Sequence, residues 1–198
     1  MPTPENLPSL AAALRLVDRE VWVITAAHAE RRGGLVATWV SSASIDPARP
    51  VLLIGLAPNH FTAHLVQNSR AFAAHLLRSS QAQLAWNFAR HSGRDGDKLA
   101  GLEYSPGVTG APVLADCLAS FECRVFARFD AGDRLFFWGD VIDGHPSDAG
   151  PSAELPLREH AFIQALTAEQ RQVLTADRAA DSQRNRPLHD RWRTTNPW

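Results

Sequence analysis

Residues 34–65 read GLVATWVSSASIDPARPVLLIGLAPNHFTAHL, and this stretch carries more information about the fold than any other. It predicts a strand, a run of small hydroxyl residues, a proline-bounded turn, a second strand and then a helix. Residues 51–57 are almost wholly apolar, which is typical of a strand that is buried on both faces. The helix is expected to begin at Phe61, after the polar residues Asn59 and His60.

The small residues at positions 40–44 leave the backbone accessible, so a flat ligand could lie against it. Hydroxyl groups surround this run, on Thr38, Ser41, Ser42 and Ser44. One strand further on, the free N–H groups at the start of the expected helix would attract phosphate. A polar edge for a ring system beside an anion site would suit flavin mononucleotide (FMN).

The composition fits one domain of 198 residues with a formal net charge of −1. This charge excludes an overall positive field for nucleic acid or an anionic membrane. No apolar run approaches the roughly 20 residues that span a bilayer, and residues 1–6 lack the features of a secretory signal. A cytoplasmic protein is therefore expected. Cys117 and Cys123 would lie on one strand, about 20 Å apart, as two reduced thiols.

The pattern predicts a mainly β fold with added helices. Helices are expected at residues 7–18, 61–68 and 80–90, and strands at 20–27, 35–40, 51–57, 71–77, 117–129 and 134–143. Turns are expected at residues 31–34 and 130–133, and loops at residues 91–98 and 143–156. Residues 1–156 would form a small closed or partly closed barrel, and residues 157–198 a charged helical extension.

Four segments in this order resemble the flavin reductase-like family, whose members have an FMN-binding split barrel. The first two are Ala37–Pro47 and Pro58–Thr62, and the third is Ser92–Lys98. The fourth is composite: Gly110–Leu114, Ala119–Arg124, Ala131–Asp133 and Gly139–Val141. The resemblance runs from about Asp18 to His145.

The resemblance implies a dimeric, Greek-key-related split β-barrel that binds FMN, or in some members FAD, near the subunit interface. It also implies hydride transfer from NADH or NADPH to the flavin, with a monooxygenase as a potential partner for the reduced flavin. The flavin ring would be lined by Thr38, Trp39, Val40, Ser41 and Ser42, with Ser44 nearby. The rest of the site would comprise Gly55 and Leu56 beneath the ribityl chain, Asn59, Phe61 and Thr62 at the phosphate, and Trp86, Phe88, His91 and Lys98 closing the pocket.

One departure from the family pattern concerns the nicotinamide side. Family members often have Gly-Asp-His in a hairpin turn, where this chain has Gly132-Asp133-Arg134. Arginine cannot act as a neutral imidazole, although it could hold the phosphates of a nicotinamide cofactor. This favours, modestly, an alternative function as an FMN-binding or electron-transfer module that does not itself oxidise NAD(P)H. A dimeric interaction domain without flavin is a third alternative.

Several chosen residues also have simpler interpretations. The serines could form the polar face of a strand, and Arg94, Asp95, Asp97 and Lys98 could be solvated ion pairs. His60 and His64 have the i,i+4 spacing of a zinc site, but no third ligand stands at a suitable interval, so no metal is expected. No Gly-x-Ser-x-Gly motif is present, which argues against acyl transfer. No residue is assigned as a catalytic acid or base.

Overall fold

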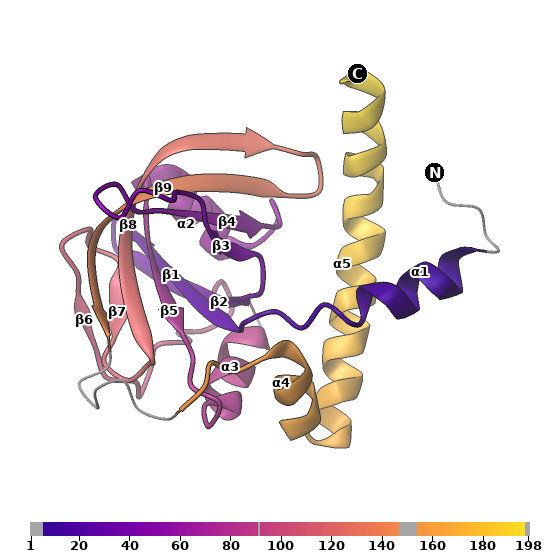
Figure 1. Ribbon diagram of the computed structural model, residues 1–198, viewed down its shortest axis with the longest axis horizontal. Helices are drawn as coiled ribbons and strands as arrows, with labels where there is room; N and C mark the ends of the chain where they lie inside the picture. Colours follow the sequence, from indigo (N-terminus) through magenta and orange to yellow (C-terminus); the bar gives the residue numbers. More distant parts are fainter. Residues whose placement is uncertain (1–5, 91, 147–153, 197–198) are drawn as a thin grey trace.

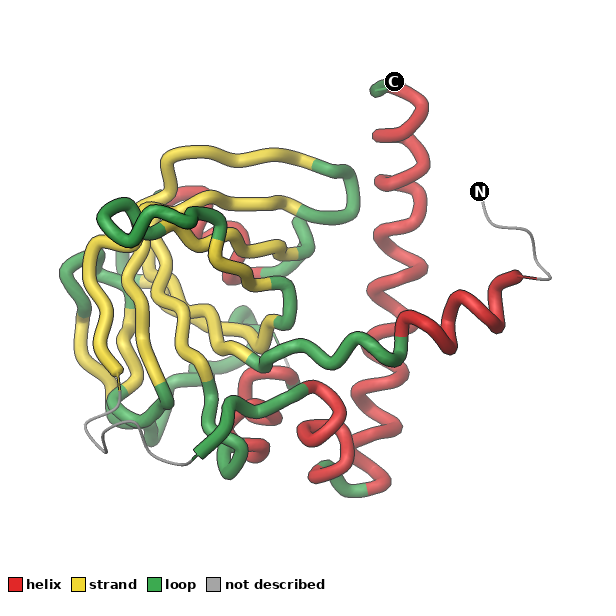
Figure 2. The backbone as a smooth tube through the Cα atoms, in the orientation of Figure 1, coloured by secondary structure: helices red, strands yellow, loops and turns green. Residues whose placement is uncertain are grey.

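A curled antiparallel sheet forms the body of the protein (Figure 1). The computed structural model describes residues 6–90, 92–146 and 154–196. In these residues one seven-stranded sheet has the order β2-β1-β5-β8-β9-β4-β3. Its strands are β1 (Trp22–His28), β2 (Arg31–Ala37), β3 (Val40–Ser42), β4 (Val51–Leu56), β5 (Ala71–Leu76), β8 (Ala119–Asp130) and β9 (Leu135–Pro146). Figure 2 shows that the sheet curls into a half-barrel, with β2 and β3 as its two open edges.

The helices and a short second sheet complete the fold. β6 (Tyr104–Pro106) pairs with β7 (Pro112–Leu114). The helices are α1 (Leu7–Leu14), α2 (Phe61–Ser69), α3 (Ala82–Ala89), α4 (Glu159–Ala165) and α5 (Ala168–Thr195). α2 packs on β1 and β2, while α3 contacts β2 and α4. α5 stands at one side of the half-barrel and extends past it (Figure 1). No helix in the described ranges is long and apolar enough to cross a membrane.

The buried side chains form two clusters on opposite faces of β1. Ile24 and Ala26 belong to the cluster inside the curl, together with Phe72 and Phe137. Val23 lies in the other cluster, which packs against α3 and α4. Successive side chains of a strand point to opposite faces, so this alternation shows that both faces of β1 are covered. The half-barrel is therefore held from inside and outside, and its edge near β2 is fixed against the helices.

Most of the expected elements are confirmed, including the strand after Pro50, the helix at Phe61 and the long hairpin of β8 and β9. The turn expected at residues 31–34 is wrong. The chain turns at Ala29, where φ is +52°, and residues 31–34 belong to β2. A Cβ atom on Gly34 would lie 2.6 Å from Cε1 of Phe88, and one on Gly33 would lie 3.1 Å from Cδ1 of Phe61. The two glycines allow aromatic rings to pack closely on a strand.

Three other expectations need correction. The first helix ends at Leu14 and buries none of its residues. β9 continues to Pro146, so the expected loop at 143–156 begins later, and residues 147–153 lie outside the described ranges. Cys117 precedes β8, so it does not share a strand with Cys123. Both thiols are buried and free, and burial raises the pKa of Cys117 to about 11 and of Cys123 to about 12.

Candidate functional site

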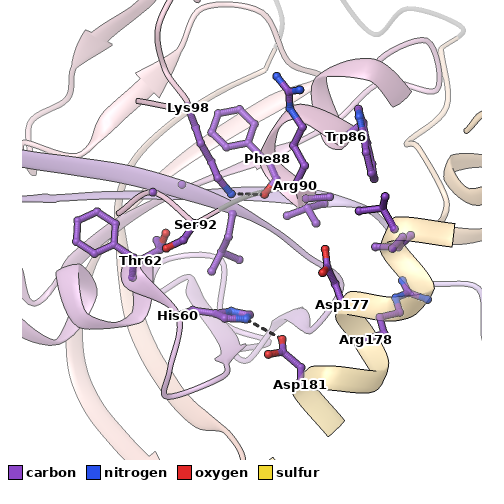
Figure 3. Close-up of a pocket in the computed structure, with 18 of the residues that line it drawn as sticks. His60, Thr62, Trp86, Phe88, Arg90, Ser92, Lys98, Asp177, Arg178 and Asp181 are labelled. Carbon is purple, nitrogen blue, oxygen red and sulfur yellow. Dashed lines mark hydrogen bonds and ion pairs between the residues drawn. The ribbon is translucent and has the colours of Figure 1, made fainter. Parts of the chain in front are cut away.

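A pocket of about 1120 Å³ lies between the half-barrel and α5 (Figure 3). One wall is formed by the end of β2 with Thr38, and by the residues that lead into α2. α3 and the loop after it form a second wall, from Trp86 to Lys98. The inner face of α5, from Glu169 to Arg184, forms the third. The volume exceeds the range of about 300–1,000 Å³ that is usual for small-molecule sites, so the pocket is large enough for a nucleotide cofactor.

The start of α2 presents unpaired N–H groups to this pocket. His60 occupies the N-cap position, but no side chain caps the helix and its first turn contains no acidic residue. The first N–H groups of a helix have no partner within the helix, and they carry the positive end of its dipole. Thr62 lies in this first turn with only 2 % of its surface exposed. An anion at this position would be stabilised by these N–H groups.

Basic side chains from the loop after α3 lie near the same helix start. Arg94 donates a hydrogen bond to the carbonyl oxygen of Asn59 over 3.1 Å, and Lys98 Nζ donates to the carbonyl of Phe88 over 2.7 Å. Among the described residues no carboxylate forms an ion pair with Arg90, Arg94 or Lys98. Burial, with the charge of Arg90 as a smaller cause, lowers the pKa of Lys98 to about 8. The barrel side of the pocket is therefore cationic, with charges free to meet a ligand.

On the opposite wall, α5 contributes a carboxylate that reaches the same residues. Asp181 Oδ2 lies 3.1 Å from His60 Nε2, and its Oδ1 accepts a hydrogen bond from Asn59 Nδ2 over 3.3 Å (Figure 3). Arg184 pairs with the same carboxylate over 3.0 Å. Burial lowers the pKa of His60, and the nearby Asp181 partly offsets this effect. Asn59 Oδ1 and His60 Nδ1 are buried without a hydrogen-bond partner among the described residues.

The structure brings seven of the residues chosen from the sequence into this pocket: Thr38, Asn59, Phe61, Thr62, Trp86, Phe88 and Lys98. Ser41 and Ser42 are exposed, Val40 and Ser44 are half-buried, and none of the four lines the pocket. The hydroxyls of Ser41 and Ser42 donate to the nearby carbonyls of Ser42 and Ser44. The contribution of these residues to a ring site therefore stays a prediction.

The structure places none of the other described candidates on the lining of the pocket. Trp39 stacks on Phe136, and the guanidinium of Arg134 lies 4.6 Å above the Trp39 ring. A Cβ atom on Gly55 would meet both rings at 3.0–3.1 Å, so this glycine permits the stack. Leu56 is 2 % exposed and belongs to the core. His91 lies outside the described residues.

The sequence interpretation missed residues that the structure places in the site. Arg94 belongs to the segment Ser92–Lys98, which carries part of the resemblance, so a second basic residue at the pocket could be expected from its position near Lys98. His60 lies in the polar segment at the expected helix start, but the sequence assigns its side chain no part in holding the phosphate; the described residues include no group of three or more potential metal ligands. Asp181 is separated from His60 by 121 positions, and no local pattern connects the two. Its role in the pocket depends on where α5 lies.

Comparison with known proteins identifies the family of this chain. The family model described as "Flavin reductase like domain" matches residues 14–171, well over half of the chain. The chain belongs to the flavin reductase-like family. The resemblance inferred from the sequence motifs is thus confirmed. The match ends near the start of α5, so nearly all of the helix that forms the third wall lies beyond it.

Relatives within the flavin reductase-like family include two of similar size. The chain is 32% identical over 151 residues to "FMN reductase (NADH) SmoA" of Agrobacterium fabrum, covering 76% of this chain and 83% of that protein. It is 30% identical over 152 residues to "NADH-dependent FMN reductase AsuE2" of Streptomyces nodosus subsp. asukaensis, covering 75% and 78%. The chain spans only about a quarter of other relatives, such as "Diflavin flavoprotein A 1" of Synechocystis sp., which is 28% identical and 24% covered.

The fold of the family is also found in solved structures. "Streptomyces globisporus C-1027 NADH:FAD oxidoreductase SgcE6" superposes with a TM-score of 0.67 at 23% identity, covering 80% of this chain and 90% of that one. The similarity supports the mainly β, half-barrel architecture described above.

Proposed function

We propose that this protein is an FMN-dependent oxidoreductase that transfers hydride from NADH or NADPH to the flavin. The observation that carries the proposal is the uncapped start of α2, which meets Arg94 and Lys98 at one end of a nucleotide-sized pocket. An anion site of this kind suits the phosphate of FMN. Two relatives of similar length, at 30–32% identity, are named NADH-dependent FMN reductases, which supports the choice of flavin and donor.

In this proposal the residues of the chain bind and orient the cofactor. Asn59, Phe61 and Thr62 hold the phosphate, and Lys98 and Arg94 neutralise its charge. Thr38 and Trp39 border the ring, with the backbone of residues 40–44 at its polar edge, and Trp86 and Phe88 close the pocket. Bound FMN supplies the ring that accepts hydride, so the protein needs no acid–base pair of its own. FAD is the alternative flavin.

We also propose that the protein is a homodimer, because in the single chain none of residues 40–44 lines the pocket. Large apolar side chains next to this segment and on the β8–β9 hairpin are exposed, including Ile45, Phe126 and Phe129. A second copy that covered them would remove apolar surface from water. We further propose that reduced flavin leaves the dimer and supplies a partner monooxygenase.

The decisive experiment is an anaerobic titration of the FMN-loaded protein with NADH and with NADPH. Loss of the flavin absorbance with either donor is expected, followed by filtration to measure how much reduced flavin leaves the protein. Arg134 lies over Trp39 at the edge of the site, where a charged group could hold the phosphates of the donor. If the flavin remains oxidised with both nucleotides while FMN binding is intact, the electron-transfer module is the better description.

Lys98 gives the proposed phosphate site a measurable dependence on pH. Since its pKa is lowered to about 8, the free protein loses this positive charge as the pH rises through 8. A bound phosphate favours the charged amine, so affinity for FMN is expected to fall about tenfold between pH 7 and pH 9. Flavin fluorescence quenching measures this affinity. Lys98→Met should bind FMN more weakly at pH 7 and show little change over this interval; an unchanged slope would place the phosphate away from Lys98.

A further inference from the structure

Most of the wall formed by α5 lies beyond the residues that the family model matches. The matched region ends at residue 171, whereas the residues of α5 that line the pocket extend to Arg184. The contact of α5 with the anion site is made by Asp181, which binds both residues that precede α2. A carboxylate at a helix N-terminus and a ligand phosphate are attracted by the same groups. The two are therefore competitors if FMN binds as proposed above.

Asp181 occupies polar atoms of Asn59, which is proposed to hold the phosphate, and of the adjacent His60. Asn59 donates its side-chain N–H to Asp181, which leaves its oxygen buried with no donor in the described part of the chain. His60 likewise directs Nε2 to Asp181, and its Nδ1 is buried without a partner there. Buried polar atoms are normally hydrogen-bonded, and leaving one unpaired is unfavourable. The contact thus uses donors that a phosphate needs and leaves two polar atoms unpaired.

The first half of α5 is attached to α4 and the core, through the ion pair of Arg178 with Glu159 over 2.9 Å and through the packing of Leu174, so a displacement concerns the part of the helix beyond Arg178. Asn185 is its only buried residue, and neither polar atom of the Asn185 side chain has a partner among the described residues. The hydrogen bond of Asp181 with His60 and its ion pair with Arg184 are partly exposed, with 31 % of the Asp181 side chain accessible. Pairs of this kind contribute little to stability. Near its end, α5 packs Trp192 edge-on against Phe129 and lies over Gly132.

We propose that the part of α5 beyond Arg178 is a displaceable wall of the flavin pocket, and that Asp181 competes with the flavin phosphate for Asn59 and His60. This inference rests on the proposed function and adds a specificity-determining residue to it. Asp181 lowers the affinity for phosphorylated flavin and leaves the affinity for riboflavin unaffected. The consequence is a flavin that exchanges readily, as a substrate does, in place of one that stays bound.

The test compares two isosteric substitutions on α5 in the full chain. Asp181→Asn is expected to bind FMN about fivefold more tightly than the unmodified protein and riboflavin equally well, as measured by fluorescence quenching. Asp177→Asn is the matched control, because Asp177 also faces the pocket but contacts neither Asn59 nor His60 (Figure 3). It should change FMN affinity less than twofold, since it removes only a screened charge. Equal gains in both variants, an equal gain for riboflavin, or weaker FMN binding by Asp181→Asn would overturn the competition.

A second measurement examines the position of α5 without any ligand. Trypsin can cleave after Arg184 only when the part of α5 beyond Arg178 detaches and unwinds, so Asp181→Asn is expected to be cut there about threefold faster than the unmodified protein. Gly132→Ala provides an independent variant, because its Cβ atom would lie 2.7 Å from Cβ of Trp192. Since φ of Gly132 is +86°, alanine also strains the turn between β8 and β9, so the melting temperature of this variant is measured beside its cleavage. Equal cleavage of all three proteins would overturn the displaceable wall. Failure of every protein to bind either flavin would instead reject the proposed function, and the competition with it, whatever the cleavage rates.

Discussion

Replacing Thr62 by valine is expected to weaken FMN binding by about 1.5–3 kcal/mol, which is roughly a tenfold to hundredfold rise in Kd. Thr62 lies in the first turn of α2, only 2 % exposed and facing the pocket. Its hydroxyl can donate to a phosphate oxygen, and hydrogen bonds to a charged acceptor are stronger than neutral ones. Valine has nearly the same shape, so the helix should remain in place while the donor is lost.

Two controls distinguish the loss of a phosphate contact from a general disturbance of the protein. Riboflavin lacks the phosphate, so Thr62→Val should bind it as the unmodified protein does. Thr175→Val is a matched control, because Thr175 is exposed on α5 and bonds only to the carbonyl of Arg171. If Thr62→Val binds FMN normally, or loses affinity for both flavins equally, the phosphate does not lie at the start of α2.

The second large effect concerns stability in acid and arises from His75 on β5. Its side chain is fully buried; Nδ1 lies 3.0 Å from the carbonyl oxygen of Val23, and Nε2 accepts a hydrogen bond from the N–H of Leu114 over 3.0 Å. These two bonds require the neutral ring with its proton on Nδ1. A second proton, on Nε2, would face the Leu114 N–H group. Burial lowers the pKa of His75 from 6.5 to about 4.

The sign of the effect follows from the lower pKa in the folded state. Above pH 6.5 the ring is neutral in both the folded and unfolded states, and His75 has no effect on the pH dependence. As the pH falls from 6.5 to 4, the unfolded chain binds a proton that the folded protein rejects. The free energy of unfolding should therefore fall by about 3 kcal/mol over this interval because of His75 alone. Below about pH 4 this contribution levels off.

Urea unfolding at pH 7, 5.5 and 4 measures this contribution. Arg32 lowers the pKa of Asp97, so this carboxylate also makes the protein less stable in acid. The contribution of His75 is therefore obtained by comparing the pH profile of a His75 variant with that of the unmodified protein. His75→Gln should be less stable at pH 7 but should lose about 3 kcal/mol less on going to pH 4. His28→Gln, at the exposed end of β1, is the control for loss of an imidazole. Parallel pH profiles for His75→Gln and the unmodified protein would show that His75 is protonated without cost.

The sequence identified those features that local chemistry controls. The apolar run at residues 51–57 forms a strand because its side chains are buried, and the helix at Phe61 begins where the polar segment ends. The chemistry of Asp130–Asp133 predicted a turn, and the two longest strands pair across it. Asn59, Thr62 and Lys98, which belong to the motif segments, line the pocket, while their binding of a cofactor stays a prediction.

The tertiary structure decided what depends on contacts between distant residues. Gly33 and Gly34 suggested a turn, but both lie in β2. The rings of Phe61 and Phe88 pack where a side chain at these two positions would stand, and neither ring is a neighbour in sequence. The charged C-terminal segment predicted a helix, and only its packing brings Asp181 to His60. Periodicity and turn chemistry act within a few residues, whereas a pocket wall depends on how a finished helix packs. Local interactions therefore determined the helices and strands and the polar segment at the start of α2, and long-range packing determined which carboxylate faces that segment.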